Sequence, residues 1–171
     1  MSPQPFSRAW FEDFAREFFA AVDSMDTTRA MSFLVQEPTC QFGNQPKISG
    51  RGQVEKVRGG PCSLLFLMQI ISYLAIVCTQ LLSDFYQVLH GMSHEIKTID
   101  TDLEHRTIYA GTVVSYVVKG DREEAPISIP VMTLLRFGTA GGGEEMKARD
   151  LSVYFDPSSV FEKMSEVQSR A

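Results

Sequence analysis

The sequence has little cysteine, little tryptophan and no run of basic residues. Its three cysteines, Cys40, Cys62 and Cys78, form no C-x-x-C pair and no even-numbered framework. This pattern excludes a disulfide scaffold and a zinc finger, and it favours reduced thiols in a cytoplasmic compartment. The first residues also lack the apolar stretch of a secretory signal, so we expect no export.

Positive charge is scarce as well. The chain has 16 lysines and arginines against 21 acidic residues, which gives a net charge of −5. Nucleic-acid binding needs a basic surface that displaces counterions, so a nucleic-acid partner is excluded. No spacing of His, Cys and carboxylates is typical of a metal site. The glycines of 138–143 lack the lysine and the helix of a phosphate-binding loop, so we expect neither a metal nor a cofactor.

Phenylalanine is abundant by contrast, with 12 residues, and several of these begin a helix. Apolar side chains recur at helical spacing on one face: Phe11, Phe14, Phe18, Ala21 and Val22. This spacing predicts an amphipathic helix. Asp26 is then placed to cap a short second helix, which Pro38 would end. Ala30, Phe33 and Leu34 would form its apolar side.

The later part of the chain has the spacing of strands. A short extended piece and four longer stretches alternate or are rich in β-branched residues: 39–42, 92–102, 106–119, 127–139 and 144–156. Gly120 and the glycines of 139–143 mark turns, and Pro130 predicts an edge position or a bulge. Asp156 as N-cap, followed by Pro157, predicts the start of a last helix.

Helices followed by antiparallel strands predict an α+β fold. We expect a curved antiparallel sheet with helices on one face, formed by a single domain over residues 6–168.

An uncharged segment interrupts this organisation. No charged residue occurs between Arg58 and Asp84, and residues 63–78 are almost all apolar. Three interpretations of residues 57–80 stay open. The segment is long enough for a membrane span, although a span would divide one compact domain. It is also apolar enough for a buried helix, which a larger protein would be needed to cover.

The third interpretation is a retained intron. Val57 codons begin with GT and a Gln80 codon can end in AG, the dinucleotides that bound an intron, and the segment keeps the reading frame. Removing it places apolar residues at one helical spacing across the junction: Val54, Leu81, Leu82, Phe85, Val88 and Leu89. The joined sequence therefore predicts a third helix.

With residues 57–80 set aside, several local motifs occur in a familiar order. They are the first helix over 11–33, Phe42-Gly43 followed by Gly50-Arg51, Ser93-His94-Glu95-Ile96, the stretch 111–116, the stretch 129–137, and Val153-Tyr154-Phe155-Asp156-Pro157-Ser158. In order and spacing they resemble the SnoaL-like branch of the nuclear transport factor 2-like superfamily, over most of residues 6–165. The resemblance implies a cone, in which a curved sheet wraps around N-terminal helices and a pocket opens at the mouth.

The functions implied by this resemblance are broad. Members include polyketide cyclases, ketosteroid-isomerase-like enzymes, epoxide hydrolases, dehydratases and non-catalytic binding modules, so the fold alone does not determine the chemistry. The enzymes use no cofactor and rely on Asp, His, Tyr or Arg in the pocket. The implied partners are a small hydrophobic ligand, polyketide- or terpenoid-like, and a second copy of the chain bound through the sheet.

His94 is the strongest candidate for a general acid or base. It shares a strand face with Met92 and Ile96, which alternation turns toward the apolar side, although a hydrogen-bonded histidine at a strand end is the structural alternative. On the last strand, alternation lets only one of Arg149 and Asp150 point inward, and Arg149 aligns with the apolar residues. A surface ion pair is the alternative for either.

Aromatic residues supply the remaining candidates. Tyr116 and Tyr154 are candidate hydrogen-bond donors to a carbonyl or enolate oxygen, with cross-strand packing as the alternative. Asp156 is sufficiently explained as a helix cap. The residues expected to line the pocket are Phe14, Phe18, Phe33, Phe42 and Tyr86.

Two functions are consistent with these observations. The first is a cofactor-free isomerase, cyclase or dehydratase in which His94 transfers a proton and Tyr116, Tyr154 or Arg149 polarises a carbonyl. The second is a non-catalytic ligand-binding or dimerisation module, which the lack of an acidic pair in the strands favours. We expect a cytoplasmic protein, with membrane association only if residues 63–78 are a true span.

Overall fold

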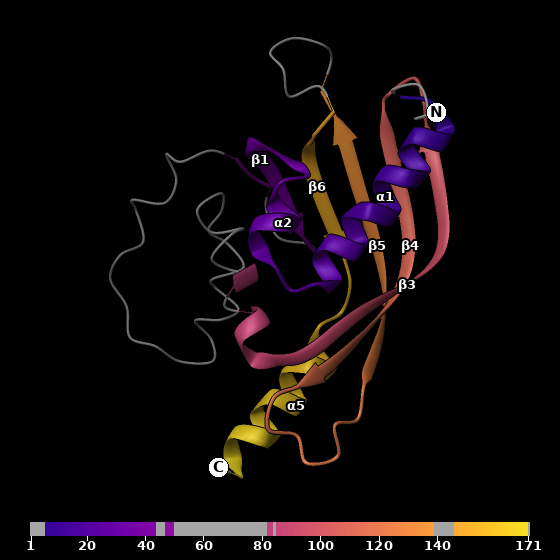
Figure 1. The fold of residues 1–171 in the computed structure, drawn as a ribbon. Helices are drawn as coiled ribbons and strands as arrows, with labels where there is room; N and C mark the ends of the chain where they lie inside the picture. The colour runs from indigo at the N-terminus through magenta and orange to yellow at the C-terminus, as the bar shows by residue number, and fades with distance from the viewer. Residues whose placement is uncertain (1–5, 44–46, 50–81, 84, 139–145, 171) are drawn as a thin grey trace.

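The computed structural model describes residues 6–43, 47–49, 82–83, 85–138 and 146–170. Within them, six strands form one sheet in the order β2-β1-β6-β5-β4-β3 (Figure 1). The strands are β1 (Leu34–Phe42), β2 (Ile48–Ser49), β3 (Leu89–Asp102), β4 (Thr107–Val118), β5 (Ile127–Phe137) and β6 (Ala148–Tyr154). All neighbours are antiparallel except β1 and β6, which run parallel, so the expected antiparallel sheet is corrected at this one pair.

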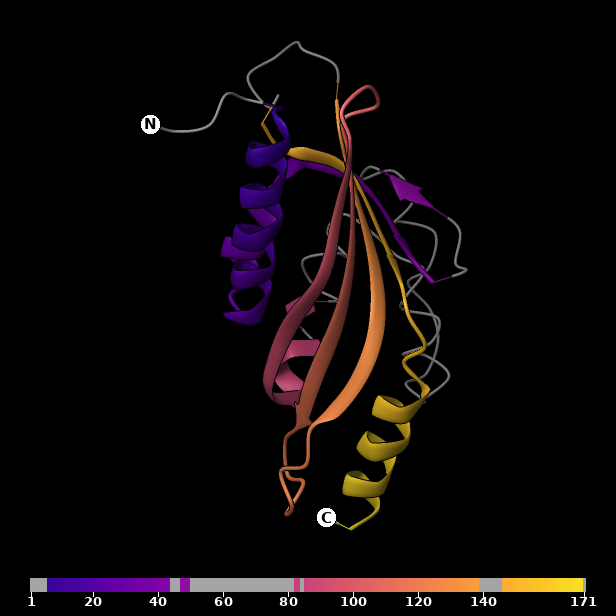
Figure 2. The same cartoon turned by 90° about the vertical axis from the view of Figure 1, so that its right-hand side faces the viewer.

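Helix α1 (Arg8–Asp23) lies along one face of the sheet, here called the inner face (Figures 1 and 2). Ser7 caps the helix by accepting a hydrogen bond from the Trp10 backbone N–H at 3.2 Å. The predicted apolar stripe is buried against the sheet, with Phe11 fully buried. This stripe forms the first apolar cluster with strand residues that include Leu34, Cys40, Ile108, Ala110, Leu135, Phe137, Ala148 and Leu151.

The short second helix is confirmed in its start but not in its end. α2 (Thr27–Met31) is capped by Asp26, whose carboxylate accepts a hydrogen bond from the backbone N–H three residues later at 3.1 Å. Phe33 lies beyond the helix, and Leu34 already begins β1, so Pro38 lies inside a strand instead of ending a helix. The register of β1 against β6 is irregular between residues 34 and 39, which accommodates a residue without an N–H.

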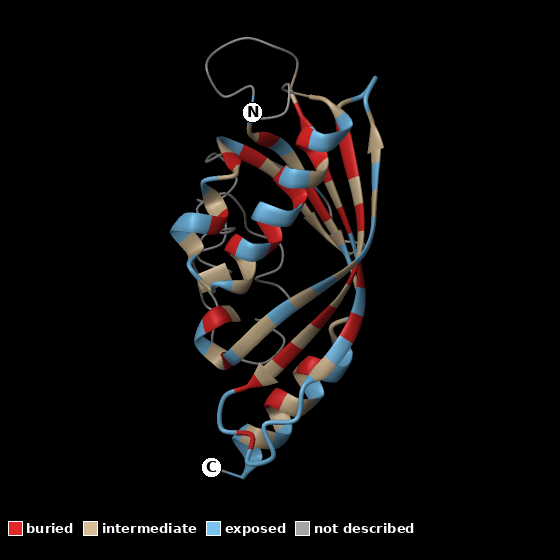
Figure 3. Ribbon diagram, turned by 45° about the vertical axis from the view of Figure 1, so that its right-hand side comes forward, coloured by how far each residue is buried: buried red, intermediate tan, exposed pale blue. Residues whose placement is uncertain are grey.

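The strands expected from alternation are confirmed, and Figure 3 shows buried positions interspersed with intermediate and exposed ones along them. Along β4 every second side chain from Ile108 to Val118 is buried. Pro130 lies on the part of β5 that pairs with β4 only, because pairing with β6 begins at Met132. The strand is therefore locally an edge at Pro130, as predicted. The turn expected at 139–143 lies outside the described residues.

Helix α5 (Ser158–Ser169) lies at the end of the sheet beyond β6 (Figure 2). Asp156 Oδ1 accepts a hydrogen bond from the Ser158 N–H at 3.0 Å, although the N-cap position itself is held by Pro157, one residue later than predicted. Val160 and Met164 are the buried side chains of α5. They form the second apolar cluster with strand residues, namely Leu89, Val114, Tyr116, Val118, Ile129 and Val131.

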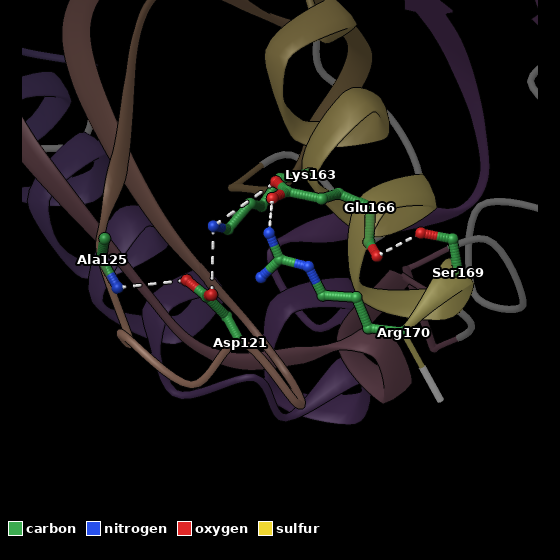
Figure 4. Close-up of polar contacts among 6 residues, drawn as sticks. All are labelled: Asp121, Ala125, Lys163, Glu166, Ser169 and Arg170. Atoms are coloured by element: carbon green, nitrogen blue, oxygen red, sulfur yellow. Dashed lines mark hydrogen bonds and ion pairs between the residues drawn. The ribbon is translucent and has the colours of Figure 1, made fainter.

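A charged network joins α5 to the hairpin between β4 and β5 (Figure 4). Lys163 Nζ lies 3.0 Å from Oδ1 of the almost fully buried Asp121, whose other oxygen accepts a hydrogen bond from the Ala125 N–H at 3.3 Å. Glu166 contacts both Lys163, at 3.6 Å, and Arg170. The bond to Lys163 lowers the pKa of Asp121, and the same bond raises the pKa of Lys163. This network anchors α5 to the hairpin.

The end of the predicted third helix is helical over residues 82–83 and 85–88. Phe85 and Val88 pack against the second apolar cluster, whereas Leu89 begins β3 and does not extend the helix. Residues 57–80 lie outside the described part of the chain, so their three interpretations stay predictions. None of the helices in the described part is long and apolar enough to cross a membrane.

Candidate active site

The side chain of His94 meets the C-terminal end of α1 on the inner face of the sheet. Its Nδ1 lies 2.5 Å from Oδ1 of Asp23, and its backbone N–H donates to Oδ2 of the same carboxylate at 3.0 Å. The His94 side chain is 8% exposed and that of Asp23 is 27% exposed. His94 therefore lies on the face predicted from alternation, but well inside β3 and not at its start.

This arrangement orients the imidazole. The ring of Phe19 lies against it, with 4.8 Å between ring centroids and an angle of 31° between planes. In a neutral imidazole whose Nδ1–H donates to this carboxylate, the second nitrogen, Nε2, carries the lone pair. A nitrogen base whose other side is held by a carboxylate has the same organisation as the base of hydrolytic triads.

Tyr116 is the neighbour of His94 on the next strand. His94 pairs with Val114, and Met92 pairs with Tyr116. His94 and Tyr116 are therefore diagonal neighbours on the inner face, with about 7 Å between their Cα atoms. The rings of Phe85 and Tyr116 pack edge to face, with 5.6 Å between their centroids. The Tyr116 hydroxyl forms no hydrogen bond with another described residue.

Tyr86 completes the group. It is 6% exposed, and its hydroxyl donates to the backbone carbonyl of Val22 at 3.2 Å. Burial, then the negative charges of Asp23 and Asp26, raise the pKa of Tyr86 to about 12. Burial, then Tyr86 and Asp23, also raise the pKa of Tyr116. Both phenols are therefore protonated at neutral pH, and both are hydrogen-bond donors instead of bases.

Tyr154 lies on the opposite, outer face of the sheet. It is 36% exposed, pairs with Met132, and its hydroxyl donates to Gln41 Oε1 at 3.3 Å. Its neighbour Val153 points to the inner face instead. The structure therefore does not bring Tyr154 together with His94.

Arg149 is also separate from this group. Ala148 pairs with Phe137, and the next paired residue is Asp150, so Arg149 is an extra residue in a bulge. The bulge breaks the alternation on which the inward orientation was predicted, and the Arg149 side chain is exposed. It also lies about eight residues, or roughly 25 Å, along the sheet from the row of His94.

The predicted pocket residues divide between core and site. Phe14 and Phe18 each pack against Phe33, with ring centroids 5.3 Å and 6.0 Å apart, and Phe42 packs against the same first cluster. Tyr86 lies near Asp23, whose charge helps to raise the tyrosine pKa, and its hydroxyl donates to the carbonyl of the preceding residue, Val22. A hydrophobic pocket stays a prediction.

Asp23 is the site residue that sequence reasoning missed. It is the last residue of α1, where the negative end of the helix dipole disfavours a carboxylate. An acid directly after the predicted helical stripe is thus a signal that some other contact compensates. Within the described residues, no group of three or more His, Cys, Asp or Glu side chains is placed to hold a metal ion.

Neither a family model nor a curated protein sequence matches this chain, whereas solved structures match it over nearly its whole length. A pinacolase from Penicillium brevicompactum is 12% identical with a TM-score of 0.61, over 100% of this chain and 98% of that chain. A protein described as a SnoaL-like polyketide cyclase, from Jannaschia sp. CCS1, is 8% identical with a TM-score of 0.62, over 96% and 97%.

A third structure, with a ketosteroid isomerase-like fold from Catenulispora acidiphila, is 14% identical with a TM-score of 0.58, over 90% of this chain and 92% of that chain. At these identities the comparison concerns the fold. The chain has the α+β cone fold that SnoaL-like and ketosteroid isomerase-like structures share, and this is the fold that the motifs predicted.

Proposed function

We propose that this protein is a cofactor-free enzyme that moves a proton on a small hydrophobic molecule, as an isomerase, cyclase or dehydratase. The observation that carries the proposal is the partly buried pair of Asp23 and His94, 2.5 Å apart, beside the protonated phenol of Tyr116. A base, a carboxylate that orients it and a hydrogen-bond donor are the groups that enolisation needs.

In the proposed reaction, His94 Nε2 removes a proton from a carbon next to a carbonyl group. Asp23 stabilises the imidazolium that forms, and the Tyr116 hydroxyl donates a hydrogen bond to the enolate oxygen. The imidazolium then returns the proton to another carbon in an isomerisation. In a dehydration it protonates a departing hydroxyl. In an aldol cyclisation the enolate carbon attacks a second carbonyl, and the imidazolium gives its proton to the alkoxide oxygen that forms.

The residues around this group support an apolar substrate. The rings of Phe19 and Phe85 and the side chain of Val114 surround the polar groups. The similar solved structures include a pinacolase and polyketide cyclases, which supports a polyketide- or terpenoid-like ligand. The buried free thiol of Cys40 supports a cytoplasmic location.

The test is turnover of 5-nitrobenzisoxazole, whose N–O bond breaks to give a coloured cyanophenolate when a base removes its ring C–H proton. We expect the rate to fall about 10²-fold or more in His94→Ala. His105→Ala is the matched control, because His105 makes a similar pair with Asp102 at 2.7 Å on the exposed surface. Equal rates for His94→Ala, His105→Ala and the unmodified protein would reject the catalytic proposal.

A second candidate function is a dimerisation or binding module. The outer face exposes Met132 (43%) and Tyr154 (36%), which are direct cross-strand neighbours. We propose that this face pairs with a second copy of the chain. Met132→Lys with Tyr154→Lys should then yield monomers in sedimentation analysis, and an unchanged sedimentation coefficient would contradict the dimer.

A further inference from the structure

Thr112 has a buried hydroxyl that no protein group satisfies. The residue is 3% exposed, and its Oγ1 has no hydrogen-bond partner in the described part of the chain. Leaving a buried hydroxyl unpaired lowers stability, whereas valine has nearly the same shape and would leave nothing unpaired. The hydroxyl at this position therefore has a cost that folding does not explain.

The position of Thr112 relates it to the proposed site. It pairs with Ile96 on β3, two residues after His94, and therefore lies on the inner face diagonally from His94, about 7 Å away. Tyr116 occupies the equivalent diagonal position on the other side. His94 is thus flanked along β4 by two hydroxyl groups, those of Thr112 and Tyr116.

We infer that Thr112 is a specificity-determining residue whose hydroxyl bonds to an oxygen atom of the ligand. This inference rests on the proposed function, since it places the ligand at His94. Thr112 and Tyr116 are four residues apart on one strand, about 13 Å between Cα atoms. A ligand that bonds to both hydroxyls therefore needs two oxygen atoms well separated along the strand direction.

This arrangement indicates a substrate class. Two oxygens that reach hydroxyls on either side of His94 lie at opposite ends of a fused bicyclic or larger skeleton, and the carbon that loses its proton lies between them. A ligand with one oxygen would satisfy Tyr116 and leave Thr112 unpaired. The site should therefore prefer doubly oxygenated polycyclic molecules to singly oxygenated ones.

The test compares the binding of 2,6-dihydroxynaphthalene and 2-naphthol by calorimetric titration. We expect the unmodified protein to prefer the diol, and Thr112→Val to reduce the ratio of the two affinities about tenfold. Thr112→Ser keeps the hydroxyl and should keep the ratio. Thr101→Val is the matched control. Thr101 also has an unpaired Oγ1, but it lies seven residues after His94 along β3, roughly 23 Å from His94.

Thermal unfolding gives a second readout. Removing an unpaired hydroxyl should raise the melting temperature of the ligand-free protein in both Thr112→Val and Thr101→Val, but only the former should change the affinity ratio. The same ratio in Thr112→Val and the unmodified protein, or no binding of either phenol, would overturn the inference. Because this ratio requires no turnover, its failure is distinguishable from a failure of His94 in catalysis.

Discussion

Asp23 and His94 are separated by 71 residues in the chain, yet Asp23 Oδ1 and His94 Nδ1 lie 2.5 Å apart. The contact joins the end of α1 to the middle of β3, and the same carboxylate accepts the backbone N–H of His94. A substitution at Asp23 should therefore affect both the orientation of the imidazole and the packing of α1 on the sheet.

For Asp23→Ala we expect a loss of about 1.5–3 kcal/mol in the free energy of unfolding, the range for a hydrogen bond to a charged group. In denaturant titrations, the double variant Asp23→Ala with His94→Ala should lose less than the sum of the two single variants, because both remove the same contact. Additive losses would show that the pair is not coupled.

Asp23→Asn removes the negative charge and keeps one acceptor. The amide oxygen can still accept one of the two hydrogens from His94, whereas the NH2 group that replaces the other carboxylate oxygen is a donor, and the neutral amide cannot stabilise an imidazolium. Turnover of 5-nitrobenzisoxazole should therefore decrease about 10²-fold, with a smaller change in stability than in Asp23→Ala. An Asp23→Asn protein with full turnover would show that the negative charge is not used.

The buried tyrosines Tyr86 and Tyr116 should lose their protons at a higher pH than an exposed tyrosine. The pKa of Tyr86 is raised to about 12, so its neutral form is favoured in the folded protein. The stabilisation is complete below the ordinary tyrosine pKa near 10, and it is lost as the pH rises from about 10 toward about 12. Tyrosinate absorbance, recorded with circular dichroism to monitor folding, should show a component near pH 12 that Tyr86→Phe removes.

The ion pair of Asp121 and Lys163 predicts an acid limb in the stability profile. Lys163 lowers the pKa of Asp121, so the carboxylate stabilises the fold above its unfolded pKa near 4, and this is lost as the pH falls through the lower folded value. The pKa of Lys163 is raised, so the stabilisation that its charge gives the fold is complete below the ordinary lysine pKa near 10. This stabilisation is lost as the pH rises through the higher pKa of the folded protein.

Asp121→Asn should therefore melt at a lower temperature than the unmodified protein at pH 7, and the difference should shrink below about pH 4. Glu124→Gln is the control, since it changes an exposed carboxylate in the same hairpin. A constant difference across this pH range would assign the loss to packing and not to charge.

Residues 57–80 provide a prediction about the gene product. If they are a retained intron, sequencing the transcript across codons 54–85 should find a product without codons 57–80. The shortened chain should also stay in solution and bind 2-naphthol, because the apolar spacing through Phe85 and Val88 is continuous across the junction. A transcript that always contains these codons would end this interpretation, and membrane fractionation would be the next measurement.

Much of the fold was predictable because it depends on local spacing. The helical stripe around Phe11 and the alternation along β4 each follow from side chains a few residues apart. The end of α2 was not predictable in this way, because Leu34 leaves the helix to pair with β6, a strand more than 100 residues later. The bulge at Arg149 is likewise a property of how two strands pair.

The site shows the same division. The sequence by itself determined that His94 lies on the apolar side of its strand, since that follows from alternation with Met92 and Ile96. Only the tertiary structure decided that Asp23 is its partner and that Tyr154 is on the other face. A contact between an imidazole and a carboxylate depends on where a helix ends against a distant strand, and the spacing of residues along either element contains no information about that distance.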